Sequence, residues 1–139
     1  MVILIDTNII LDVLCQRNDF YKDSANIFRL CEIKKLYGVV STLSFANISY
    51  IMRKEYAASK IGEILERLSF IFDISDLTVE DLKRAAALNF KDYEDAIQCA
   101  CALRSKADYI ISRNTKDFTL SKIPAITPKE FLEIFNYNF

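Results

Sequence analysis

The stretch V2-I-L-I5-D6-T7-N8 decides the fold of this chain. Positions 2–5 are all apolar and mostly β-branched, a pattern that predicts a strand buried on both of its faces. Burial on both faces is typical of a parallel sheet with helices on either side. Asp6 ends the apolar run, and apolar residues at helical spacing continue to Cys15. The stretch therefore predicts a strand followed by a helix, with a carboxylate where the strand ends.

The rest of the chain repeats this alternation. We expect further strands at 37–41, 70–74, 109–112 and 125–126, and helices at 8–15, 21–35, 43–56, 59–68, 78–89, 92–104 and 128–135. Gly38 is expected in a turn, Ser59 as a helix cap and Thr78 as the start of a capping box. The alternation predicts a three-layer α/β/α sandwich with a central parallel sheet of four to five strands. Residues 1–139 contain no linker or repeat and are expected to form a single domain.

Composition excludes several classes of chemistry. The chain has 18 basic and 19 acidic residues, so no overall basic field points to nucleic acid. It has no histidine, which excludes Ser-His-Asp triads, Cys-His pairs and histidine zinc sites. Its two glycines, Gly38 and Gly62, are too far apart for a dinucleotide-binding loop or a P-loop.

The cysteines and the apolar segments concern the compartment. Cys15, Cys31, Cys99 and Cys101 form no C-x-x-C pair and are expected to be buried apolar thiols, which suits a reducing compartment. The N-terminus lacks the basic region of a signal peptide, and no apolar stretch reaches the ~18–20 residues of a transmembrane helix. We therefore expect a cytoplasmic protein with no membrane segment.

Four carboxylates are expected at one edge of the sheet. Asp6 follows the first strand, Asp92 and Asp95 begin a helix, and Asp117 follows the fourth strand. Asn47, early in the helix after the second strand, belongs to the same edge. Each acid alone is explained as a helix cap or a turn residue. Together they repel one another unless a cation binds among them, and Mg²⁺ and Mn²⁺ prefer such oxygen ligands.

Other polar residues surround these acids in the sequence. Neutral hydrogen-bonding groups are expected nearby at Thr7, Asn8, Ser112 and Asn114. Arg113 and Lys116 share a loop with Asp117, and more basic residues that can rim the edge are Arg53, Lys54, Arg104 and Lys106. An acidic centre with basic neighbours suits a metal site that handles a polyanion, with lysine and arginine on the flanking phosphates.

With these motifs in view, the sequence resembles the PIN-domain family over nearly its whole length, and VapC-like toxins and their bacterial relatives most of all. Three segments carry the resemblance: V-I-L-I-D6-T-N8-I-I-L-D12, D92-Y-E-D95-A-I-Q-C-A-C-A and I-I-S112-R-N114-T-K-D117-F118. Each motif is weak alone, and their order and spacing make the set strong.

The resemblance implies a Mg²⁺- or Mn²⁺-dependent ribonuclease. By position, Asp6, Asp95 and Asp117 would bind the metal, with Asp92 as an additional catalytic candidate. The family usually has a glutamate where this chain has Asn47, which is a poorer ligand. Either Asp92 or Glu94 supplies the missing charge from another direction, or the metal affinity is low or the site inactive. Asp12 is expected to support Asn8, one turn earlier in the same helix.

These expectations lead to three functional hypotheses. The first is metal-assisted hydrolysis of RNA phosphodiester bonds by a toxin, with RNA as substrate and a cognate antitoxin that covers the acidic edge. The second, motivated by Asn47, is a weak or inactive PIN-like module that binds RNA or protein. The third is a phosphoacceptor or phosphatase on a similar α/β sheet with Asp6 at its site, but the chain lacks the second acid that such sites have after the first strand. A homodimer is common in the family, and the aromatic segment 135–139 is expected to dock on the body of the protein.

Overall fold

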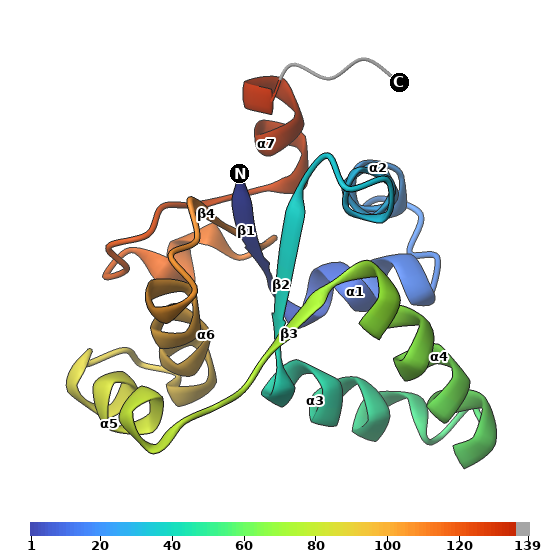
Figure 1. Ribbon diagram of the computed structural model, residues 1–139, viewed down its shortest axis with the longest axis horizontal. Coiled ribbons are helices and arrows are strands. Elements are labelled where there is room, and N and C mark those ends of the chain that lie inside the picture. The colour runs from blue at the N-terminus through green and yellow to red at the C-terminus, as the bar shows by residue number, and fades with distance from the viewer. Residues whose placement is uncertain (136–139) are drawn as a thin grey trace.

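A five-stranded parallel sheet lies between layers of helices in the computed structural model, which describes residues 1–135 (Figure 1). The strands are β1 (Val2–Ile5), β2 (Tyr37–Ser41), β3 (Asp73–Ser75), β4 (Tyr109–Ile111) and β5 (Ala125–Ile126). The helices are α1 (Thr7–Leu14), α2 (Tyr21–Glu32), α3 (Thr42–Met52), α4 (Ala58–Ile71), α5 (Val79–Ala87), α6 (Tyr93–Arg104) and α7 (Pro128–Phe135), with a 3₁₀ turn, η1 (Thr115–Phe118). The predicted α/β/α sandwich with a parallel sheet is confirmed.

The order of the strands determines where a ligand can bind. The sheet runs β3-β2-β1-β4-β5, so the chain builds outward from β1 through β2 to β3 and then returns to the other side of β1. A parallel sheet binds ligands where the order reverses, at the carboxyl ends of its strands. Here that point lies between β1 and β4, and the Asp6 amide continues their ladder by donating to the Ile111 carbonyl at 3.0 Å. Asp6 therefore stands at the switch point.

The core fills both faces of the sheet. Ile3 and Ile5 are fully buried toward α1, α2 and α7, together with Phe131. Leu4 points the other way and packs with Ile110 against α6. Figure 1 shows the same division, with α5 and α6 on one side of the sheet and α1 to α4 on the other. The apolar run at positions 2–5 is thus buried on both faces, as predicted.

Gly38 lies inside β2 and not in the turn expected from the sequence. A Cβ atom at this position would stand 2.6 Å from Cδ1 of Phe72 and 2.8 Å from the sulfur of Cys31. Both distances are shorter than van der Waals contact, so the side chain is omitted because the packing leaves no room for it. The local sequence around Gly38 could not predict this, because Phe72 and Cys31 approach from other parts of the chain.

The boundaries of α4 and β3 also differ from those predicted. The helix begins at Ala58 with Ala57 as its N-cap, so Ser59 lies within the helix and does not cap it. It continues to Ile71, and β3 therefore begins only at Asp73. The apolar residues near position 70 belong to the last turn of a helix, which a short apolar run cannot distinguish from a strand.

Three smaller expectations have different outcomes. Cys31, Cys99 and Cys101 are buried free thiols, but Cys15 is exposed, so the expectation of burial is wrong for that residue. No helix within residues 1–135 has the length and apolarity to span a membrane. Phe135 stacks on Phe131 with ring centroids 5.7 Å apart, whereas positions 136–139 of the aromatic segment lie outside the described residues.

Candidate functional site

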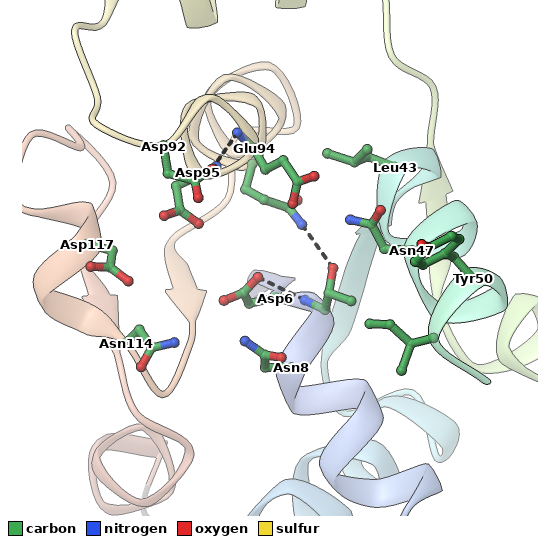
Figure 2. A pocket seen from close by; sticks show the side chains of 13 residues that line it. Asp6, Asn8, Leu43, Asn47, Tyr50, Asp92, Glu94, Asp95, Asn114 and Asp117 are labelled. Atoms are coloured by element: carbon green, nitrogen blue, oxygen red, sulfur yellow. Dashed lines mark hydrogen bonds between the residues drawn. The ribbon is translucent and has the colours of Figure 1, made fainter. Parts of the chain in front are cut away.

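A cavity of about 430 Å³ opens at the carboxyl edge of the sheet (Figure 2). It is lined by Asp6, Thr7, Asn8, Leu43, Asn47, Tyr50, Ile51, Asp92, Glu94, Asp95, Gln98, Asn114 and Asp117. The lining comes from the end of β1, the start of α1, α3, α6 and the region of η1. The structure therefore brings the four predicted carboxylates together, along with Asn8, Asn47, Glu94 and Asn114.

Asp6 is buried, and hydrogen bonds hold both of its carboxylate oxygens. It caps α1, and its Oδ1 accepts a hydrogen bond from the Thr7 amide at 2.9 Å. Its Oδ2 accepts one from the Ser112 hydroxyl at 2.8 Å, and that hydroxyl in turn accepts from the Asn114 amide at 3.1 Å. Burial raises the pKa of Asp6, while the bonds from Ser112 and Thr7 oppose the shift. Ser112 is itself fully buried, so it orients Asp6 and does not face the cavity.

The start of α6 supplies three carboxylates, Asp92, Glu94 and Asp95, of which the first and last are held differently. Asp92 is the N-cap and accepts hydrogen bonds from the amides of Glu94, at 2.8 Å, and Asp95, at 3.3 Å. Asp95 is half-buried and points toward Asp6 and Asp117 (Figure 2). Burial, followed by the charges of Asp92, Asp6, Asp117 and Glu94, raises the pKa of Asp95 to about 7. The negative charges of four neighbouring carboxylates thus add to burial in disfavouring the ionised form of Asp95.

This raised pKa predicts how the stability of the metal-free protein depends on pH. The pKa of Asp95 lies at about 7 in the folded chain against 3.8 for a free carboxyl group, so the folded state binds an extra proton between these values. The free energy of unfolding is expected to fall as pH rises through this window. The measurement is thermal unfolding from pH 4 to pH 8 with a chelator present. The charged groups that line the two cavities with Asp95 are Asp6, Lys91, Asp92, Glu94, Lys116 and Asp117.

Asp95→Asn is the control for this pH dependence, because it removes the titrating group and keeps the side-chain shape. The variant is expected to show a shallower fall in melting temperature over the same range. Melting curves for the two proteins that shift in parallel at every pH would contradict the assignment to Asp95.

Asp117 reaches the cavity from the loop after β4. The 3₁₀ turn η1 is anchored by Phe118, which is buried in the core, and by the Asp117 amide, which donates to the Asn114 carbonyl at 3.0 Å. Lys116 is exposed and lines a neighbouring cavity of about 480 Å³ together with Asp92, Asp95 and Asp117. The predicted basic neighbour at position 116 thus stands beside the acids.

Across the cavity from these acids lies α3. Figure 2 shows Asn47 and Tyr50 on this helix on one side of the cavity, with Asp92, Asp95 and Asp117 on the other and Asp6 between them. The side of the cavity formed by α3 presents an amide where the other side presents carboxylates. The negative charge of the site therefore lies on the side of the cavity opposite α3.

Arg113 is not placed as the sequence suggested. It does not line the cavity; its Nε lies 2.8 Å from Oδ2 of Asp12, and its guanidinium stacks 4.2 Å from the ring centroid of Phe20. Asp12 is fully buried and also pairs with Arg17 at 3.1 Å. The expectation that Asp12 supports Asn8 is wrong, because its partners are two arginines. Arg113 accordingly pairs with a buried carboxylate and does not line the cavity where a contact with substrate was predicted.

Arg104 is likewise engaged away from the acidic edge. Its Nε lies 2.9 Å from Oδ2 of Asp81, the buried capping-box residue of α5. It therefore ties α6 to α5 and does not rim the cavity.

Gln98 is a cavity residue that sequence reasoning missed. It lies one turn after Asp95 and is 3% exposed. Its Nε2 donates to the Ser44 hydroxyl at 2.9 Å, and Ser44 and Thr7 share a hydrogen bond of 2.7 Å. Its Oε1 is buried without a hydrogen-bond partner among the described residues. The available signal was a lone amide within the otherwise apolar run A96-I-Q-C-A-C-A102.

The donor set suits a hard divalent cation by its chemistry. All of the charged groups on the cavity wall are carboxylates, and no hydrogen bond from a described residue reaches the side-chain oxygens of Asp95 or Asp117. Oxygen-only ligands are the preference of Mg²⁺ and Mn²⁺. Within residues 1–135, however, no three acidic or cysteine side chains are close enough to hold a metal ion as they stand. Direct binding by three of them would therefore need the carboxylates to move toward one another, with the charge of the cation offsetting their mutual repulsion.

The sequence of the chain is similar to those of known proteins. A family model for the PIN domain matches residues 2–116. The chain is 27% identical over 139 residues to Ribonuclease VapC1 of Aquifex aeolicus, an alignment that covers 96% of this chain and 95% of the relative.

Solved structures resemble the fold at lower identity. A chain of VapBC2 from Rickettsia felis, bound to a DNA fragment from its promoter, superimposes with a TM-score of 0.70 at 17% identity, covering 91% of this chain and 98% of that one. A chain of FitAcB from Neisseria gonorrhoeae gives a TM-score of 0.69 at 18% identity, with coverage of 91% and 98%. A toxin-antitoxin complex from Klebsiella pneumoniae gives 0.64 at 24% identity, with coverage of 90% and 96%.

Proposed function

Because this chain belongs to the PIN domain family, we propose that it is a Mg²⁺- or Mn²⁺-dependent endoribonuclease, the toxin of a toxin-antitoxin pair. The observation that carries the proposal is the convergence of Asp6, Asp92, Asp95 and Asp117 on one cavity at the switch point of the sheet. The likeness to Ribonuclease VapC1 over nearly the whole chain supports the choice of RNA as substrate.

The proposed roles follow from how each side chain is held. Asp6, Asp95 and Asp117 would hold the cation, and Asp92 is an additional carboxylate beside them. A cation held there would supply a neutralising charge for the scissile phosphate and would lower the pKa of a water bound to it. Ser112 and the Thr7 amide fix the orientation of Asp6, as the hydrogen bonds of 2.8 and 2.9 Å indicate.

The neutral and basic groups have supporting roles in the same proposal. Asn8 and Asn114 offer amides at the cavity wall that can orient a phosphate oxygen or a water. Lys116, exposed beside the acids, is suited to a flanking phosphate of the RNA backbone. In this arrangement the basic residue lies outside the acidic centre, where it attracts substrate without competing with the cation for the carboxylates.

RNA cleavage with controlled metal tests the proposal directly. Purified protein is incubated with a single-stranded RNA in Mg²⁺, in Mn²⁺ and in excess chelator, and the products are separated by length. We expect cleavage with either metal and none with the chelator. Equal cleavage in all three conditions, or no cleavage in any, would contradict the proposal.

A catalytically weak PIN-like module is the second candidate, and Asn47 is the observation that favours it. An amide carries no charge, so the α3 side of the cavity contributes less to cation binding than a carboxylate would. Mn²⁺-dependent thermal stabilisation separates the two candidates, because only a protein that binds the cation is stabilised by it.

Asn47→Glu is expected to strengthen the site. A carboxylate on α3 faces the others across the cavity, so Mn²⁺ affinity and RNA cleavage are expected to rise by about 10-fold, within the range by which groups around a metal change its binding. Asn47→Gln is the matched control, since it lengthens the side chain without adding charge. Calorimetric Mn²⁺ titration measures the affinity, and identical affinities in the two variants would exclude α3 from the site.

A cognate antitoxin is the proposed partner. The resemblance to chains solved as toxin-antitoxin complexes supports it, as does the one-sided negative charge of the cavity, which suits a basic side chain from a partner. Inhibition of RNA cleavage by a small protein from a neighbouring reading frame tests the antitoxin.

The proposal also includes a homodimer of this chain. Sedimentation of the purified protein tests its oligomeric state.

A further inference from the structure

Tyr50 is an aromatic side chain that lines the acidic cavity yet remains 65% exposed. It stands on α3, one turn after Asn47, and faces the cavity opposite Asp117 (Figure 2). An exposed tyrosine contributes little to the core, so its packing does not explain the position of its ring. Ile51, its neighbour on the same wall, is also exposed and adds an apolar side chain beside the Asn47 amide.

Arg53 holds the Tyr50 ring in a defined position. Its guanidinium carbon lies 3.7 Å from the centroid of the ring, and its Nη1 donates a hydrogen bond to the Tyr50 carbonyl. Arg53 is the C-cap of α3, where the helix carbonyls favour a cation. The guanidinium lies over one face of the ring, and no other aromatic ring or cation among the described residues lies against it, while Tyr50 is 65% exposed.

An open aromatic face backed by a cation is a platform for a flat π-system with a nearby negative charge. Nucleobases stack on tyrosine rings and guanidinium planes, and the adjoining phosphates are attracted to arginine. The carboxylates across the cavity repel phosphate, so the base would lie on the α3 side. The adjoining phosphate would approach the acids only when a cation is bound among them.

We propose that Tyr50 and Arg53 form a stacking subsite for one unpaired base of a single-stranded RNA, adjacent to the acidic cavity. This inference rests on the proposed function, because it assigns a substrate contact to the same site. A base within a duplex is already stacked on its neighbours, so the subsite selects unpaired nucleotides. Because every base has a π-face, the subsite favours single strands without reading a sequence.

The other exposed tyrosine near the acids does not offer the same platform. Tyr93, the first residue of α6, donates its hydroxyl to the Leu82 carbonyl at 3.0 Å and is absent from the cavity lining. Tyr50 is therefore the tyrosine on the cavity wall itself.

The experiment measures RNA binding without cleavage, in an Asp6→Asn background. Fluorescence anisotropy compares an 8-nucleotide oligoadenylate with an abasic oligomer of equal length. Tyr50→Ala is expected to weaken oligoadenylate binding by about 5- to 100-fold, and Tyr50→Phe to retain it. Binding of the abasic oligomer is expected to be weak and unchanged by Tyr50→Ala. Tyr37→Ala is the matched control, because Tyr37 is 57% exposed at the start of β2, the opposite edge of the sheet.

Several outcomes would overturn the subsite. Equal affinity of Tyr50→Ala and its parent for oligoadenylate would do so, as would an equal loss for the abasic oligomer, which would indicate a backbone contact. Retained RNA affinity with weakened antitoxin binding would assign Tyr50 to a protein interface. If the wild type cleaves RNA with metal while Tyr50→Ala binds normally, the stacking subsite fails and the proposed function stands. If the Asp6→Asn protein binds no RNA and the wild type cleaves none, both fail.

Discussion

Asp6→Asn is expected to lower metal-dependent RNA cleavage by at least about 100-fold. Loss of a group that merely supports a metal ligand costs ~10–100-fold, and Asp6 is proposed to bind the cation itself. The substitution is conservative for the fold, because an amide oxygen can still accept from the Thr7 amide at the start of α1. The Ser112 hydroxyl can rotate to accept from the new amide group. The initial rate of cleavage in Mn²⁺, compared between variant and wild type, measures the effect.

Asp73→Asn is the matched control for this experiment. Asp73 is exposed at the start of β3, so it changes the net charge by the same amount at the opposite edge of the sheet. Its cleavage rate is expected to equal that of the wild type, and the melting temperatures of both variants establish that they are folded. Equal cleavage by the Asp6→Asn protein and the wild type would identify the activity as a contaminant and remove the basis of the proposed function.

The second large effect concerns stability. The double variant Arg17→Gln, Arg113→Gln is expected to lose about 3–5 kcal/mol of unfolding free energy, because it leaves a buried carboxylate without a charged partner. The two arginine side chains are 37% and 25% exposed, whereas that of Asp12 is 0% exposed. The arginines can return to water when the pair is broken, and Asp12 cannot. Denaturant unfolding at pH 7 measures the loss.

Asp12→Asn in that double variant tests the explanation. Removing the stranded charge is expected to restore part of the lost stability, so the triple variant should be more stable than the double variant. Lys83→Gln serves as a surface control, since its ion pair with Glu80 spans 3.9 Å between side chains that are 71% and 83% exposed. Such pairs contribute ~0–1 kcal/mol. A double variant as stable as this control would show that Asp12 does not need its arginines.

The acidic site could be predicted from the sequence because it depends on topology. Asp6 ends a strand, Asp92 and Asp95 begin a helix, and Asp117 follows another strand, so a parallel sheet places them at one edge whatever the details of packing. Asn47 was located by the same argument. Local patterns of strand, helix cap and turn sufficed for these residues.

Features that depend on side-chain packing could not be predicted in the same way. Arg113 is adjacent to the acids in sequence, but its guanidinium turns toward a buried carboxylate and the ring of Phe20. Gly38 is determined by the approach of Phe72 and Cys31 from distant elements. The position of Tyr50 under Arg53 depends on two side-chain orientations that helical spacing alone leaves open.

Because β1 lies at the centre of the sheet and pairs with the late strand β4, the acidic site can form only after much of the chain has been synthesised. Asp6 is bonded to Ser112 although the two are 106 residues apart, and Asp95 and Asp117 are also made late. At ~5–20 residues per second on the ribosome, roughly 5–20 s separate the synthesis of Asp6 from that of its partner. During that interval the nascent chain carries the first carboxylate without the rest of the site. A chain that ends before Ser112 would therefore lack both Asp117 and the hydrogen bond that orients Asp6, and it is expected not to cleave RNA.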